Sequence, residues 1–175
     1  MATLDPGIYV AARRINESGL ARLGSHQFVV MVIGEEAKQC YANATVVEKH
    51  NVIVLGAYNI DGKLLPAYNA TSDVGALRNH LSGASKLDIE KVKTSTDLNE
   101  ARALLQLLTY TYEQKSKKKA IAYPASGGLF ESKCLNSNSF AQSIVEYAFG
   151  KNAVKEDFDG MDICNSNRIP TGNFY

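Results

Sequence analysis

Six consecutive apolar residues, Phe28–Ile33, follow a serine, a histidine and a glutamine and end at a glycine. A run of this length, rich in β-branched residues and stopped by glycine, predicts a buried strand. A second run of the same character, Asn51–Tyr58, predicts a second strand. The Asp61-Gly62 pair that follows is a strong signal for a tight turn into a third strand at 64–68. The first half of the chain therefore predicts a small antiparallel meander, preceded by a short strand at Ile8–Val10.

Helical spacing replaces the strand pattern in the second half of the chain. Apolar residues there recur three and four positions apart, which is the signature of an amphipathic helix. The longest such segment ends in a run of lysines, where cations stabilise the C-terminal end of a helix. The sequence also predicts a helical turn or two at 88–92 and an edge strand at 120–123. The helices are expected over 72–81, where Ser72-Asp73 supply the cap, from 96 or 97 to about 115, and over 140–149.

Length and composition fit one domain. With 175 residues, 45% of them hydrophobic, the chain can bury a core without disulfide or metal support. We expect a single domain over 1–175 of α+β class, in which a small antiparallel sheet packs against helices. Residues 151–175 are polar and irregular, and we expect them to wrap the surface as a C-terminal tail.

Charge and hydropathy exclude several classes of protein. The 19 basic residues are balanced by 18 acidic residues, so nucleic-acid binding by bulk electrostatic attraction is not expected. Nowhere do about 18 apolar residues run together, so no membrane span is expected. The N-terminus lacks the basic and apolar regions of a signal peptide. We expect synthesis in the cytoplasm, and any export would use a route that reads no classical signal.

The three cysteines, Cys40, Cys134 and Cys164, are odd in number and widely spaced, which is a poor framework for disulfides. No Cys-x-x-Cys pair occurs and the three histidines lack metal-ligand spacing, so no metal site is expected. Cys134 stands shortly before the helix predicted at 140–149. The N–H groups and dipole of a helix start stabilise a thiolate and an oxyanion, so Cys134 is the candidate nucleophile.

His26 is the candidate base, because it stands at the mouth of the strongly apolar strand and can project at a sheet edge. A cysteine nucleophile needs a base that the fold, not the sequence, brings close. We therefore predict that His26 and Cys134 meet. His50 and His80 lack such a setting and are expected to be ordinary surface or packing residues. Cys164 is a rival nucleophile, but no apolar helix follows it.

Three segments carry a resemblance to a known family. Gly24–Val30 resembles the histidine strand of permuted NlpC/P60-like hydrolases, papain-fold enzymes in which the histidine precedes the cysteine. Cys134–Phe140 resembles their cysteine helix, where Cys-Asn-Ser-Phe is typical, with additional residues between the cysteine and the phenylalanine here. Asp157–Gly160, followed by Ile169-Pro170 and Phe174-Tyr175, is similar to the tails of versions found in bacterial toxins and type VI secretion effectors.

This resemblance implies a papain-like cysteine amidase or peptidase that needs no cofactor. It implies that Cys134 attacks a peptide or isopeptide carbonyl, with bacterial cell-wall peptide as the first substrate to consider. An immunity protein and a secretion-system carrier are the partners implied. Two other interpretations stay open: an acyltransferase or deamidase that uses the same thioester, and a non-catalytic effector that binds a host or target-cell protein.

In such enzymes a third polar residue, on the strand beside the histidine strand, orients the imidazole. Antiparallel pairing of the first two strands of the meander places Asn59 beside His26. Its amide oxygen would accept a hydrogen bond from the ring and fix the tautomer. Asn59 also starts the tight turn, where asparagine is favoured for local reasons. Tyr58 and Asp61 are the alternatives for this third role.

Overall fold

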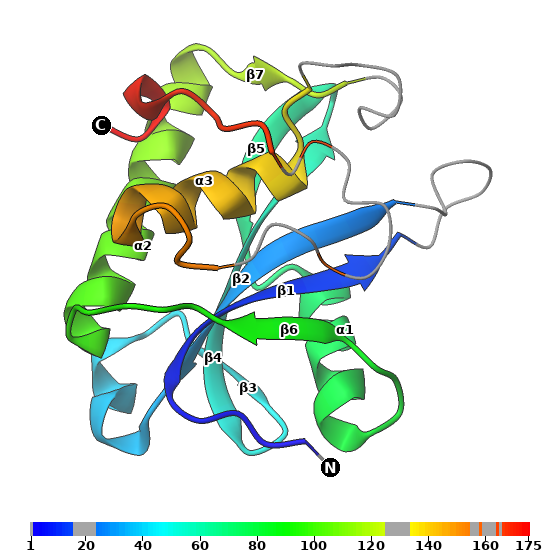
Figure 1. The fold of residues 1–175 in the computed structure, drawn as a ribbon, viewed down its shortest axis with the longest axis vertical. Helices are drawn as coiled ribbons and strands as arrows, with labels where there is room; N and C mark the ends of the chain where they lie inside the picture. The colour runs from blue at the N-terminus through cyan, green and yellow to red at the C-terminus, as the bar shows by residue number, and fades with distance from the viewer. Residues whose placement is uncertain (1, 16–23, 125–133, 155–157, 159–163, 165) are drawn as a thin grey trace.

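The computed structural model describes residues 2–15, 24–124, 134–154, 158, 164 and 166–175, which Figure 1 shows as a coloured ribbon. Within them, helices cover both faces of one antiparallel sheet. The helices are α1 (Thr71–Ser82), α2 (Leu98–Lys118) and α3 (Ser137–Phe149), with short 3₁₀ helices η2 (Glu35–Cys40) and η3 (Thr171–Asn173). The strands are β1 (Gly7–Arg14), β2 (Ser25–Ile33), β3 (Thr45–Val47), β4 (His50–Ile60), β5 (Lys63–Tyr68), β6 (Asp88–Lys91) and β7 (Ile121–Ala122).

The strand order across the sheet is β6-β1-β2-β4-β5-β7, and β3 pairs with β4. Every pair of neighbouring strands is antiparallel. The strands β2, β4 and β5 form the predicted meander, in which Val29 lies opposite Leu55. The α+β class is therefore confirmed, as is the edge strand expected near 120–123.

The strand β2 is buried along its whole length, which explains its uninterrupted apolar sequence. Successive side chains of a strand point to opposite faces of the sheet. Val29 and Met31 belong to a core shared with α2 and α3, whereas Phe28 and Val30 belong to a second core shared with α1. Because both faces of β2 are covered, neither set of alternating positions can be polar without finding a specific partner.

All three predicted helices are present. The Asp97 carboxylate accepts hydrogen bonds from two N–H groups in the first turn of α2, and lysines occupy the last turn of that helix. The side chain of Asn136 caps α3 in the same way. The helix α1 begins at Thr71 without a side-chain cap, although Asp73 was a candidate cap from the sequence. That leaves the Asp73 carboxylate available for another contact.

Where the sequence predicts helical turns at 88–92, the structure has the strand β6. Its backbone pairs with the otherwise open edge of β1, with Ile89 opposite Ala11. A segment this short cannot hold a helix by its own hydrogen bonds, so the sheet edge decides its conformation.

The C-terminal tail enters the core, which corrects the expectation that it only wraps the surface. Phe174 is 1% exposed and packs against Tyr112 and Phe140, with ring centroids 5.2 Å and 6.2 Å away. Ile169 of the same tail is fully buried. Most of the Asp157–Gly160 motif lies outside the described residues.

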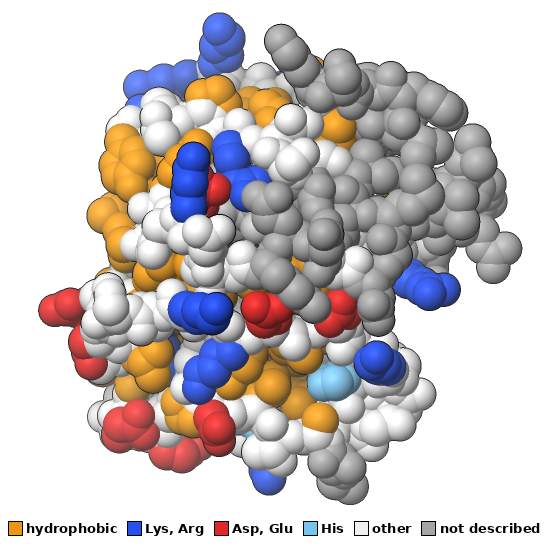
Figure 2. Space-filling view, in the orientation of Figure 1, with side chains coloured by type: hydrophobic (Ala, Val, Ile, Leu, Met, Phe, Trp, Pro, Cys, Tyr) orange, Lys and Arg blue, Asp and Glu red, His pale blue; other side chains and the backbone are white. Residues whose placement is uncertain are grey.

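Basic and acidic side chains are interspersed on the face shown in Figure 2, and neither sign covers it. This mixture agrees with the near balance of 19 basic and 18 acidic residues in the sequence. In the part of the chain that the structure describes, no helix is long and apolar enough to cross a bilayer.

Candidate active site

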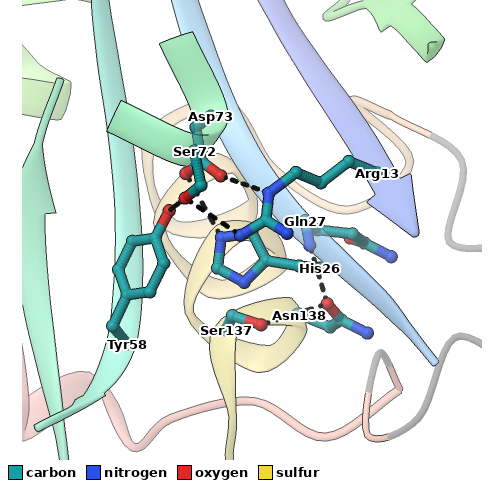
Figure 3. A network of polar contacts seen from close by, with 8 residues as sticks. All are labelled: Arg13, His26, Gln27, Tyr58, Ser72, Asp73, Ser137 and Asn138. Atoms are coloured by element: carbon teal, nitrogen blue, oxygen red, sulfur yellow. Dashed lines mark hydrogen bonds and ion pairs between the residues drawn. The ribbon is translucent and has the colours of Figure 1, made fainter. Parts of the chain in front are cut away.

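A cluster of polar side chains lies where three neighbouring strands meet the first turn of α1 (Figure 3). His26 shares one face of β2 with Phe28, and that is the face covered by α1. Arg13 reaches the cluster from β1, and Tyr58 reaches it from β4. Asp73 enters from α1 and contacts both His26 and Arg13.

The carboxylate of Asp73 is the centre of the cluster, and its side chain is fully buried. Oδ1 accepts a hydrogen bond from Arg13 Nε at 2.7 Å, and Oδ2 lies 3.2 Å from His26 Nε2. Arg13 also donates through Nη2 to the hydroxyl of Ser72 at 3.1 Å. A buried carboxylate without partners is strongly destabilising, so Arg13 and His26 are what allow Asp73 to lie in the core.

The ionisation of Asp73 fixes the position of the proton on His26. Burial alone would raise the pKa of the Asp73 carboxyl, but His26 and Arg13 outweigh burial and hold this pKa below its usual value. An ionised carboxylate only accepts, so Nε2 of a neutral His26 carries the hydrogen shared with Asp73. Nδ1 is then the basic nitrogen, and it has no hydrogen-bond partner among the described residues. This is the tautomer that a general base requires.

Gly56 of β4 leaves the space that the His26–Asp73 pair occupies. A Cβ atom at this position would lie 2.9 Å from Asp73 Oδ2 and 3.6 Å from His26 Nε2. Tyr58 covers the pair, with its ring centroid 4.6 Å from that of His26 and its hydroxyl 3.1 Å from Ser72 Oγ. Burial raises the pKa of Tyr58 to about 12, so this hydroxyl stays protonated at neutral pH.

The first turn of α3 lies beside the beginning of β2. The backbone N–H of Gln27 donates to Asn138 Oδ1 at 2.8 Å, and Gln142 Nε2 donates to Gln27 Oε1 at 2.8 Å. The pairing of β2 with β4 begins only at Val29, so α3 supplies the acceptor for the N–H of Gln27. The start of α3 therefore fills the place where these two strands diverge.

Ser137 is the first residue of α3, and only 2% of its surface is exposed. Its hydroxyl donates to Asn138 Oδ1 at 3.4 Å, the same oxygen that accepts from Gln27. Figure 3 shows Ser137 on the side of the His26 ring that faces away from Asp73. Sequence reasoning did not select Ser137, although it lies within the Cys134–Phe140 motif and a serine hydroxyl at a helix start was a signal that could have found it.

Cys134 and Cys164 form a disulfide, with their Cα atoms 5.6 Å apart. The expectation that the cysteines do not pair is therefore wrong, because the tail returns to the start of α3 across a separation of 30 residues. A disulfide sulfur is no thiolate and cannot act as the nucleophile. Among the described residues, the Cys134 sulfur also contacts Asn167 Nδ2, at 3.8 Å, and makes no hydrogen bond with His26. The structure thus does not join the predicted pair, and Cys40 is free and exposed.

Asn59 lies in the turn, where its Oδ1 accepts a hydrogen bond from the N–H of Gly62 at 2.9 Å. The sequence-based register is off by one residue, so that Tyr58 and not Asn59 lies beside His26. The structure places Asp73 at the far nitrogen of the imidazole, which is the position expected for Asn59. The sequence signal for Asp73 was an acidic residue in a first helical turn, which suggested a cap.

A groove of about 700 Å³ adjoins the cluster between β1, β6 and α1. Arg13 and Ser72 form its side nearest the site, and Arg14, Lys86 and Asp88 also line it. Basic side chains therefore outnumber acidic ones along this groove. No group of three or more potential metal ligands among His, Cys, Asp and Glu occurs in the described part of the chain.

Comparisons of the chain with protein-family models, curated proteins and solved structures find no match. What the site can do follows from its own groups. They are an imidazole held in one tautomer, a buried carboxylate that orients it, and a helix start next to the imidazole. Acyl transfer by nucleophilic catalysis uses groups of these kinds.

Proposed function

We propose that this chain is a hydrolase of peptide or isopeptide amide bonds that works through a covalent acyl intermediate. His26 is the general base and acid, and Asp73 is the residue that positions it. The observation that carries the proposal is the chain of contacts from Arg13 through the buried carboxylate of Asp73 to His26. Such a buried charge network is a poor source of stability but an effective way to hold an imidazole in one tautomer.

The family resemblance supports the same chemistry and supplies the substrate class. In a permuted papain-like fold of the NlpC/P60-like type, the histidine strand precedes the nucleophile helix, and β2 precedes α3 in this chain. The proposed substrate is bacterial cell-wall peptide, and the proposed setting is a toxin or type VI secretion effector with an immunity protein and a carrier. The Cys134–Cys164 disulfide supports export, because disulfides persist in oxidising compartments.

One observation favours a second function, that of a non-catalytic effector. The sulfur of Cys134, the nucleophile predicted from the sequence, is tied up in a disulfide. In that case the scaffold would bind a host or target-cell protein, and the His26–Asp73 pair would only stabilise the fold. The two functions differ in one measurable property, which is hydrolysis that depends on His26.

The test uses bacterial peptidoglycan digested with a muramidase, with new amino and carboxyl termini identified by mass spectrometry. We expect His26→Ala to lower turnover roughly 10³-fold or more, because the variant lacks the proposed general base. Asp73→Asn should lower kcat by up to about 10⁴-fold with little change in KM, because an amide does not enforce the reactive tautomer.

The matched control is His80→Ala. His80 lies in α1, the helix that carries Asp73, and accepts a hydrogen bond from the N–H of Leu87. Turnover by this variant should equal that of the wild type. Equal hydrolysis by the wild type and His26→Ala, at equal folded fraction by circular dichroism, would reject His26 as the base. A folded wild type that cleaves none of these peptides would favour the binding effector.

A further inference from the structure

The start of α3 presents a hydroxyl on the side of the His26 ring that faces away from Asp73 (Figure 3). Ser137 is the first residue of the helix, and Figure 3 shows it across the ring from Asp73. His26 itself is only 5% exposed, and its Nδ1 has no partner among the described residues. We infer that Ser137, and not Cys134, is the nucleophile of this site, an inference that rests on the proposed function.

The Ser137 hydroxyl and the backbone next to His26 donate to the same acceptor, the side chain of Asn138. Asn138 Oδ1 accepts from the backbone N–H of Gln27, the peptide group that follows His26, at 2.8 Å. The same oxygen accepts from the Ser137 hydroxyl at 3.4 Å. The second contact is long, so the hydroxyl is weakly held and can turn to Nδ1 of His26 when substrate arrives.

The backbone around Ser137 offers a donor for the oxyanion. The side chain of Asn136 accepts from the N–H groups of Asn138 and Ser139, which leaves the first N–H of the helix outside the cap. The N–H of Ser137 has no acceptor among the described residues. An N–H on the nucleophile itself, at the positive end of a helix dipole, is well placed to stabilise a tetrahedral intermediate.

Cys134 fits the role less well on two independent grounds. Its sulfur is bonded to Cys164, so it has no thiol proton to give to His26 and cannot form the thiolate that attacks a carbonyl carbon. It also precedes the cap residue Asn136, so it lies before the helix start and outside the first turn. The disulfide instead ties the segment before α3 to the C-terminal tail.

The reaction balances with water as the second reactant. The Ser137 Oγ–H bond breaks as the proton moves to His26 Nδ1, and Oγ bonds to the amide carbon. The C–N bond then breaks while Nδ1 returns the proton to the leaving amine, which gives an ester on Ser137. Water attacks that ester and gives one proton to Nδ1, and this proton returns to Oγ as the carboxylic acid leaves.

Diisopropyl fluorophosphate is the probe, because it labels activated serine hydroxyls whether or not the natural substrate is known. In the full chain, peptide mapping should find the adduct at Ser137, and His26→Ala should reduce the labelling rate at least roughly 10³-fold. Ser137→Ala should lose the adduct and the peptidoglycan hydrolysis together. Ser143→Ala is the matched control, since this buried serine of α3 accepts from the N–H of Ile169 and should leave labelling unchanged.

The double variant Cys134→Ala/Cys164→Ala separates the two nucleophiles. Per folded molecule, it should keep its labelling and hydrolysis within about threefold of the wild type. A threefold change in rate corresponds to less than about 1 kcal/mol in the activation barrier. The inference would be overturned by the absence of an adduct at Ser137 in the wild type, or by full hydrolysis by Ser137→Ala. In either case, hydrolysis that still depends on His26 would leave the proposed function in place. Labelling at Ser137 that requires His26, without cleavage of any tested amide, would uphold the inference and reject amide hydrolysis.

Discussion

At the scale of single residues, Gly56 limits the space that is available to the His26–Asp73 pair. It lies on β4 directly under the His26–Asp73 contact, and Arg13 prevents the carboxylate from moving away freely. A methyl group at Gly56 would come within 2.9 Å of Asp73 Oδ2, so the Gly56→Ala variant must displace the carboxylate. We expect a loss of stability of about 1–3 kcal/mol from overpacking. We also expect roughly a 100-fold loss of turnover, because a small misplacement of a catalytic group is costly.

Gly75 in α1 provides the control for Gly56. A Cβ atom at Gly75 meets nothing within 4 Å, so Gly75→Ala should stabilise the helix by about 0.5–1 kcal/mol and leave turnover unchanged. Urea denaturation and the peptidoglycan assay measure both effects. Equal stability and activity for Gly56→Ala and the wild type would mean that the His26–Asp73 contact does not depend on this space.

At the scale of elements, the cap of α3 links stability to the site. The Asn136 side chain accepts from two N–H groups of the first turn, and Ser139 Oγ accepts in turn from the backbone N–H of Asn136. Replacement of Asn136 by alanine should lower the free energy of unfolding by about 0.5–2 kcal/mol. Turnover should also fall, by roughly tenfold or more, because the same turn carries Ser137 next to His26.

The cap of α2 makes the comparison specific. Asp97 accepts from the N–H groups of Asn99 and Glu100, far along the chain from the site. Asp97→Ala should cost a similar free energy of unfolding, about 1 kcal/mol, without any change in turnover. If both cap variants lose activity in proportion to their loss of stability, then the first turn of α3 has no special part in catalysis.

Elements that contain their own signal could be predicted from the sequence. The apolar run of β2 and the helical spacing of α2 are local patterns, and both elements lie where expected. The strand β6 could not be predicted, because its conformation depends on the free edge of β1. Asn59 was placed at the histidine by a register that is off by one residue, since η2 and β3 lie between β2 and β4 and no tight turn fixes how these two strands pair.

The site shows the same division between local and non-local signals. His26 could be selected because it stands beside an apolar strand, but Asp73 looked like a helix cap. Its contact with the imidazole spans 47 residues of sequence, and only the packing of α1 against the sheet creates it. The pairing of Cys134 with Cys164 likewise depends on the path of the tail, which spacing alone cannot specify.

At the scale of the whole molecule, the disulfide joins the segment before α3 to a tail that ends in the core. Cys134 and Cys164 are separated by 30 residues, and Phe174 beyond them packs against Tyr112 of α2. A cross-link of this span restricts the unfolded chain and typically contributes about 2–4 kcal/mol. The tail and the helix should therefore unfold together while the disulfide is intact.

Removal of the disulfide in Cys134→Ala/Cys164→Ala should lower the melting temperature by roughly 5–15 °C, since each kcal/mol corresponds to about 2–4 °C for a chain of this size. Dithiothreitol should shift the wild type by a similar amount and leave the double variant unaffected. Cys40→Ala is the control, because this cysteine is free and exposed and its loss should change stability by less than about 0.5 kcal/mol. Thiol titration in denaturant without reductant should find Cys40 alone. Reaction of all three cysteines in that titration would show that Cys134 and Cys164 are not oxidised. The predicted shift in melting temperature would then have no basis.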